Sequence, residues 1–135
     1  MAVAYAKDIA NHLEFLGYEI DKSEDENGVS IYANQETKPN LTIRLTKFGV
    51  LIMIRWSGTD PTALKSKEFH SALNTANAQS FLTKWYYSEN DDKAVILHVE
   101  TVLHRYEKQE FGSTVDRMLE EDTANRTLFD KFWEK

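Results

Sequence analysis

The most apolar run of the chain, residues 41–56, predicts two strands in the middle of a sheet. Before Gly49 the run alternates between apolar and polar residues, which is the period-two pattern of a half-buried strand. After Gly49 both faces are apolar. One face carries Val50, Ile52, Ile54 and Trp56, and the other carries Leu51, Met53 and Arg55. Such a strand lies centrally in a sheet, or presents its second face to a helix, a partner or a ligand.

Apolar residues at three- and four-residue spacing predict three helical regions. The first ends at Gly17, and its apolar positions are Ala6, Ile9, Ala10, Leu13 and Leu16. The second begins with Asp60 as N-cap and Pro61 at the first helical position. It is expected to bury Phe69, Ala72, Leu73 and Ala76. The third lies in the tail, where apolar positions from Phe111 to Trp133 fit one long helix or two short ones.

The remaining strands are predicted in hairpins. Residues 18–22 are extended, a polar turn covers residues 23–28, and the strand that follows buries Val29, Ile31 and Ala33. Residues 81–89 pair with residues 93–102 across an acidic turn at 88–92. The order is helix, three main strands, helix, two strands, helix (α-β-β-β-α-β-β-α). This order predicts an α+β fold with a mainly antiparallel sheet.

Composition narrows the class of protein. A chain of 135 residues is long enough for a single domain over residues 1–135. The 22 acidic against 16 basic residues give a net charge of −6, which disfavours duplex nucleic acid and anionic membranes. The chain has no cysteine, no secretory signal and no apolar run approaching ~18 residues. We therefore expect a cytoplasmic protein without disulfides.

Two segments carry a resemblance to a known family. Leu73-Asn74-Thr75-Ala76-Asn77 leads into Phe81-Leu82-Thr83-Lys84-Trp85-Tyr86, and an acidic turn precedes Ala94-Val95-Ile96-Leu97. With the order of elements, they resemble the YbjN-type family of proposed bacterial sensory transduction regulators. The resemblance implies a fold similar to type III secretion chaperones, which are small acidic dimeric proteins that bind other polypeptides. It carries over no catalytic residues. The charged stretch 104–110 departs from the family pattern.

Residues that could carry chemistry are few, and a solvated surface explains each group. His98, Glu100 and His104 could approach a zinc ion, but a site needs three or four well-placed ligands and their supporting partners. The loop at residues 21–32 begins like a calcium loop but has Glu26 and Tyr32 where glycine and glutamate are needed. Glu120-Glu121-Asp122 are expected on a polar helix surface. We expect no catalytic residues, no metal and no cofactor.

Three functions follow from these patterns. The leading one is a non-enzymatic protein-binding module, a regulator or chaperone-like adaptor that binds another polypeptide or itself as a homodimer. Its expected partner-binding residues share the sheet face opposite the helices: Leu51, Met53, Arg55, Ile96 and His98. The tail could instead cover that face. An enzyme or small-ligand-binding protein with an unrecognised site is the alternative. A third is a single-stranded nucleic-acid binder that stacks bases on Trp85-Tyr86-Tyr87.

Overall fold

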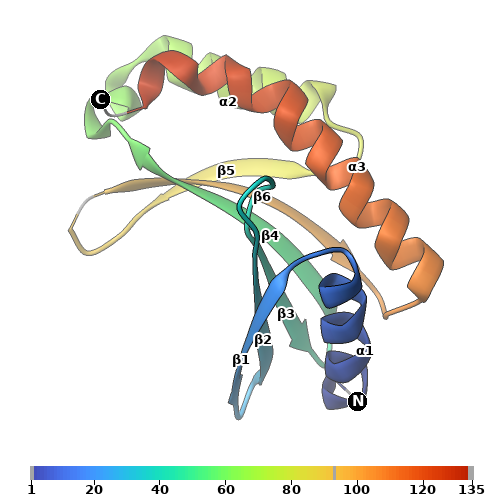
Figure 1. Cartoon of the computed structure of the whole chain (residues 1–135). Coiled ribbons are helices and arrows are strands. Elements are labelled where there is room, and N and C mark those ends of the chain that lie inside the picture. Colours follow the sequence, from blue (N-terminus) through green and yellow to red (C-terminus); the bar gives the residue numbers. More distant parts are fainter. Residues whose placement is uncertain (1, 93, 134–135) are drawn as a thin grey trace. The chain divides into compact units, whose positions relative to one another are not determined.

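The computed structural model describes residues 2–92 and 94–133. Its elements are α1 (Ala2–Phe15), β1 (Glu19–Asp25), β2 (Gly28–Asn34), β3 (Leu41–Thr46), β4 (Gly49–Thr59), η1 (Pro61–Lys65), α2 (Lys67–Gln79), β5 (Lys84–Glu89), β6 (Val95–Leu103), α3 (Lys108–Arg126) and η2 (Thr127–Phe132) (Figure 1). The strands follow the order β1-β2-β3-β4-β6-β5, and consecutive pairs along the chain are antiparallel where they pair. The predicted α+β class with a mainly antiparallel sheet is confirmed, and the predicted order is one strand short, because four strands, β1 to β4, precede α2.

The chain packs as two compact units. Unit 1 comprises Met1–Ile54 and Thr101–Val115, and unit 2 comprises Arg55–Glu100 and Asp116–Lys135. Strands β4 and β6 and helix α3 each contribute residues to both. That residues 1–135 act as one domain stays a prediction.

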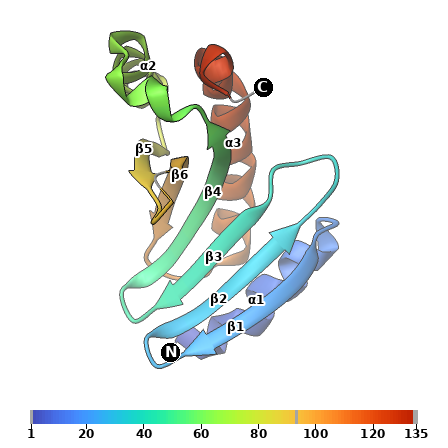
Figure 2. The ribbon, with the colours of Figure 1, turned by 90° about the vertical axis from the view of Figure 1, so that its left-hand side faces the viewer.

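In unit 1, α1 packs along one face of β1, β2 and β3 (Figure 2). Four of its predicted apolar positions, Ala6, Ile9, Ala10 and Leu13, are buried, whereas Leu16 follows the end of the helix and is half-buried. The strand residues that alternate toward this core are in register, with Ile31 opposite Ile43 and Ile43 opposite Ile52. Burying this many branched side chains between one helix and the sheet supplies the main hydrophobic stabilisation of the unit.

The first hairpin differs from the prediction in its turn. Strand β1 continues to Asp25, so only residues 26–27 form the turn that was expected over residues 23–28. Asp25 accepts hydrogen bonds from Arg44 at 2.9 Å and from the Asn27 amide at 2.8 Å, and the Arg44 hydrogen bond is the main reason that the pKa of Asp25 is lowered. Gly28 has φ +152°, and a Cβ there would lie 2.1 Å from the Leu45 carbonyl oxygen. Only glycine allows this approach.

In unit 2, aromatic rings of α2, β5 and η2 form the core. Phe129 stacks on Trp85 with ring centroids 5.7 Å apart, and Phe69 makes edge contacts with Phe129 and Phe132. Trp85 is the register partner of Val99, so these rings pack on the strand face that carries Val95, Leu97 and Val99. The tail is one 19-residue helix followed by a short 3-10 helix. Phe129 and Phe132 of the tail pack against Trp85 and Phe69, on the core side of the β5–β6 hairpin and not on its opposite face.

The segment after Trp56 was predicted as a strand end, a turn and one helix. Strand β4 runs on to Thr59, and Asp60 caps the 3-10 helix η1, accepting a hydrogen bond from the Thr62 amide at 2.9 Å, with Pro61 at its first position. Ser66 then caps α2 separately. The predicted buried positions of α2, from Phe69 to Ala76, are confirmed.

Strand β5 begins at Lys84 rather than at the predicted residue 81, because a buried carboxylate binds the preceding segment. Glu121 accepts hydrogen bonds from the backbone amides of Phe81, Leu82 and Thr83 at 2.9–3.2 Å. The Thr83 hydroxyl donates to the same carboxylate at 2.7 Å. With its amides held in this way, the segment is not extended, and the side chain of Phe81 is 92% exposed.

The expectation that Glu120, Glu121 and Asp122 are all solvated is wrong for two of them. Glu121 and Asp122 are buried, and only Glu120 is exposed. Burial pushes the pKa of Glu121 upward, but the hydrogen bonds from Thr83, Phe81 and Leu82 outweigh it and leave the pKa below its usual value. Burial raises the pKa of Asp122, although the indole of Trp56 donates to it at 2.7 Å.

We predict that Ile54→Asp unfolds the protein. Ile54 is 1% exposed, and an unpaired carboxylate there costs several kcal/mol against a total stability of about 5–15 kcal/mol. Thermal and urea melts measure the effect. Val102→Asp is the matched control, since Val102 is also apolar and in a strand but is 63% exposed. Similar melting of both variants would contradict the assignment of Ile54 to the core.

We predict that Glu121→Gln lowers stability at pH 7 by about 2–3 kcal/mol, whereas Glu120→Gln has little effect. Because the folded pKa of Glu121 is lowered, its carboxylate stabilises the fold above the unfolded pKa near 4.5, and this contribution is lost as the pH falls through the folded value. Urea melts from neutral to acidic pH should therefore show a flatter stability profile for Glu121→Gln. Equal profiles for the two variants would show that Glu121 does not hold the segment before β5.

Candidate functional site

The candidate site lies on the face of the β5–β6 hairpin that points away from the core of unit 2. Side chains alternate between the two faces along a strand. The paired residues Trp85 and Val99 face the core, so the residues next to each of them in sequence face outward. Tyr86 is opposite His98, and Ser88 is opposite Ile96. We define the hairpin face as Lys84, Tyr86, Ser88, Ile96, His98 and Glu100.

Aromatic stacking and hydrogen bonds hold the hairpin face in one arrangement. The rings of Tyr86 and His98 stack with centroids 4.6 Å apart and an interplanar angle of 6°. The Tyr86 hydroxyl donates a hydrogen bond to Glu100, and Ser88 Oγ lies 2.6 Å from His98 Nε2. Lys84 Nζ lies 5.4 Å from the centre of the Tyr86 ring. The side chains are therefore ordered before any partner binds.

The hairpin face holds neutral aromatic groups at neutral pH. Burial lowers the pKa of His98, and the positive charge of Arg55 lowers it further. Burial raises the pKa of Tyr86 to about 12, and the hydrogen bond to Glu100 acts in the same direction. His98 is 8% exposed, and its Nδ1 atom has no hydrogen-bond partner among the described residues. A charged imidazole is therefore disfavoured here.

The Ser88–His98 contact has the geometry of a nucleophile beside a base, but it lacks the rest of a catalytic arrangement. In such sites a third group orients the imidazole through its second nitrogen. Here that nitrogen is buried, and no described residue bonds to it. The Ser88–His98 contact by itself is therefore not a catalytic site.

The five residues predicted to bind a partner lie in both units. Ile96 and His98 belong to the hairpin face, and Arg55 is exposed in the same unit, where its charge acts on His98. Leu51 and Met53 belong to unit 1, where they lie opposite Arg44 and Thr42 of β3.

Exposure differs within the predicted set. Leu51 and Ile96 are half-buried, whereas Met53 is only 7% exposed. The partner-binding role of all five stays a prediction. The predicted set missed Lys84, Tyr86, Ser88 and Glu100 as members of this surface, and the register of the hairpin was the signal that could have found them.

The metal and nucleic-acid hypotheses gain nothing from the geometry. Over the described ranges, no group of three His, Asp or Glu side chains is placed to hold a metal ion. The aromatic run divides between the two faces, because Trp85 and Tyr87 contact Phe129 and Phe69 in the core and only Tyr86 belongs to the hairpin face. In the described part of the chain, no helix is long and apolar enough to cross a membrane.

Comparison with known proteins finds similar structures but no similar sequences. No protein-family model matches the chain, and no curated protein sequence matches it. Solved structures do match, and they confirm the predicted YbjN-type fold. A chain of a type III secretion complex has a similar fold. The structures are less than 20% identical to this chain, so they establish its fold alone.

Three of the similar structures are the following. YbjN from E. coli, described as a candidate transcription regulator, has a TM-score of 0.65 and 17% identity over 92% of this chain and 88% of its own. An uncharacterised protein from Methanothermobacter thermautotrophicus has a TM-score of 0.70 and 13% identity over 93% of this chain and 97% of its own. A chain of the heterodimeric ExoU-SpcU complex from the type III secretion system of Pseudomonas aeruginosa has a TM-score of 0.56 and 18% identity over 91% of this chain and 98% of its own.

We predict that His98 titrates below its ordinary value of 6.5. Since the folded pKa is lowered, the unfolded chain binds more protons between the two values, and stability falls as the pH drops below about 6.5. Imidazole NMR signals followed against pH measure this pKa, and His98→Gln assigns the signal. Arg55→Gln should raise the pKa of His98 only part of the way toward 6.5, because the positive charge is removed but the burial that lowers the pKa remains. A pKa at or above 6.5 in the folded protein would contradict the burial of His98.

Proposed function

We propose that the chain is a non-enzymatic protein-binding module, a regulator or chaperone-like adaptor, that engages another polypeptide or a second copy of itself through the hairpin face. One observation carries the proposal. The aromatic residues of α2 and η2 pack on the core side of the hairpin, so the ordered Tyr86–His98 pair on the other side is not covered by them.

The chemistry of this surface suits recognition of a polypeptide. Tyrosine and arginine are enriched where proteins meet, and here Tyr86 is half-buried and Arg55 is exposed. Ile96 adds a half-buried apolar side chain beside them. Because stacking and hydrogen bonds already restrict Tyr86 and His98, binding would cost less conformational entropy than it would for free side chains.

The similar structures support this proposal at the level of class. YbjN is described as a candidate transcription regulator, and the ExoU-SpcU structure is a complex of two different polypeptides. A chain with this fold therefore occurs in a complex of two different polypeptides. Leu51 and Met53, which belong to unit 1, stay in the predicted partner-binding set without support from the hairpin face, and Met53 is only 7% exposed. A cytoplasmic location and a homodimer remain predictions.

A small-ligand-binding protein or an enzyme is the second candidate. The observation in its favour is the 2.6 Å contact between Ser88 Oγ and His98 Nε2. A metabolite that bound there would raise the melting temperature, whereas a protein-binding module would be stabilised by a protein instead. A thermal-shift screen of small metabolites therefore separates the two candidates.

We predict that Ile96→Lys lowers capture of the partner by about tenfold or more, because an ammonium group would replace an apolar contact. Purified protein is immobilised, exposed to lysate of the source organism, and the bound proteins are quantified by mass spectrometry. Light scattering on the free protein tests for a homodimer that the same substitution disrupts.

Phe15→Lys is the matched control for this experiment, because Phe15 is an apolar residue that is 88% exposed in unit 1. It should keep the partner and the mass of the unmodified protein. Melting curves confirm that both variants are folded. If Ile96→Lys keeps partners and mass, or if only Phe15→Lys loses them, the hairpin face is not the binding surface.

A further inference from the structure

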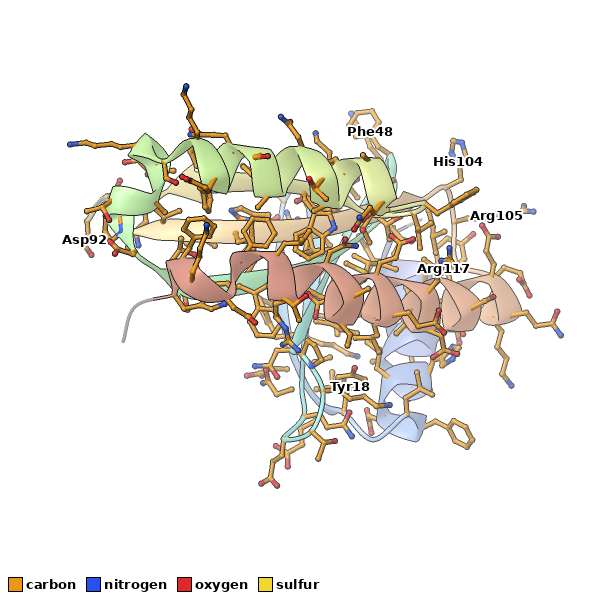
Figure 3. The ribbon with its side chains drawn as sticks, turned by 90° about the horizontal axis from the view of Figure 1, so that it is seen from above. Tyr18, Phe48, Asp92, His104, Arg105 and Arg117 are labelled. Atoms are coloured by element: carbon orange, nitrogen blue, oxygen red, sulfur yellow. The ribbon has the colours of Figure 1, made fainter. Side chains whose placement is uncertain are left out.

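A second surface in unit 1 combines an apolar floor with a basic rim. It is a groove of about 330 Å³. Leu45 and Val50, each 1% exposed, form its floor, and Tyr5 of α1 forms one wall. The rim carries Lys47, His104 and Arg105, all exposed. In Figure 3, His104 and Arg105 project outward from the ribbon, as does Phe48.

A single glycine brings the two basic segments of this groove together. Gly49 has φ +145°, and a Cβ at this position would lie 2.4 Å from the Leu103 carbonyl oxygen. The absence of a side chain lets the start of β4 pass directly against the end of β6. The turn that carries Lys47 and the segment that carries His104 and Arg105 therefore line the same hollow.

The groove is formed before any ligand binds. The turn on one side is closed by a hydrogen bond from the Phe48 amide to Thr46 Oγ1 at 3.1 Å. On the other side the ring of Tyr5 packs near that of Tyr106, with centroids 6.3 Å apart. Tyr106 is held in turn through its hydroxyl, 3.1 Å from His12 Nδ1. Fixed walls of this kind favour binding because little order has to be gained.

The groove is lined by basic and neutral side chains, although the chain as a whole is acidic. The chain carries a net charge of −6, yet none of the residues that line the groove is acidic. Two other hollows in unit 1 do carry carboxylates, one lined by Asp8 and the other by Glu19 and Glu36. The nearby carboxylate of Glu107 is occupied by the amides of Gln109 and Glu110 at the start of α3.

We propose that this groove binds an acidic segment of a partner polypeptide that carries a large apolar side chain. The apolar side chain packs against Tyr5 and the aliphatic parts of the rim side chains, above the buried Leu45 and Val50, and flanking carboxylates pair with Lys47 and Arg105. Phe48 is 79% exposed between two lining residues and extends the apolar surface beyond the groove. The volume is at the lower end for small-molecule sites, which are about 300–1,000 Å³, and suits one side chain of a longer ligand.

This site is separate from the hairpin face, and it neither requires nor supports binding there. Its test uses a fluorescein-labelled peptide, Glu-Asp-Phe-Asp-Glu with blocked ends, followed by fluorescence anisotropy at low salt. Three comparison ligands accompany it: the same peptide with Ala for Phe, a peptide with Lys for every acidic residue, and free 3-phenylpropionate. Only the acidic peptide with Phe should bind well, and binding should weaken as salt is raised.

The double variant Lys47→Glu, Arg105→Glu should bind the acidic peptide about tenfold more weakly or worse, because both rim charges are reversed. Lys67→Glu, Lys108→Glu is the matched control with the same net charge, and it should bind like the unmodified chain. NMR shifts induced by the peptide in the unmodified protein should centre on residues 45–50 and 104–105, which tests the site even if the double variant is unfolded.

Three outcomes would overturn the proposal. The first is equal loss of binding in both double variants, which would indicate a general charge effect. The second is binding of free 3-phenylpropionate but not of the peptide, which would make the groove a small-molecule site. The third is a failure of the peptide to bind at residues 45–50 and 104–105, shown either by peptide-induced shifts elsewhere in the protein or by no binding at low salt. Binding that needs Phe, the acidic residues and the two rim charges together would support the proposal.

Discussion

The backbone amides of Phe81, Leu82 and Thr83 belong to neither the helix before them nor the strand after them, and the carboxylate of Glu121 accepts hydrogen bonds from all three. Unit 2 depends on this interaction, because Glu121 is buried and a buried polar group without hydrogen-bond partners costs about 1–3 kcal/mol, and more when it is charged. Glu121 ties α3 to the entry of β5. Asn77 completes the connection, since its side chain bonds to both backbone polar groups of Trp85 at 2.8 and 2.9 Å. The start of β5, and hence the direction of Tyr86, follows from these contacts.

The same stretch of helix shows how strongly local surroundings decide the state of a carboxyl group. Glu121 and Asp122 are adjacent and buried, yet the pKa of the first is lowered and that of the second is raised. Glu121 has several donors that stabilise its charge, whereas Asp122 has the Trp56 indole and an oxygen without a partner among the described residues. The hairpin face follows the same rule, where burial keeps the aromatic groups of His98 and Tyr86 neutral.

Most of the fold could be predicted from the sequence because its apolar periodicity is strong. The spacing of Ile9 and Leu13, the alternation in β3 and the two-sided pattern of β4 all matched the buried positions. The errors lie where a distant side chain replaces a local signal. Glu121 lies 38 residues from Thr83 in sequence, so no local pattern places it beneath that segment. The pairing of Tyr86 with His98 likewise depends on strand register, and the basic groove depends on two turns that periodicity does not bring together.

Gly28 and Gly49 have a consequence for recognising distant relatives of this chain. Each lets a strand pass against a carbonyl oxygen, of Leu45 in one case and of Leu103 in the other, at a distance that no side chain would permit. The similar structures share fewer than one residue in five with this chain, so overall identity is a poor guide to this fold. Two glycines, one at the start of the second strand and one at the start of the fourth, form a geometric signature. A search for that pair, spaced by one intervening strand, would show whether other chains with this fold keep the same two close backbone contacts.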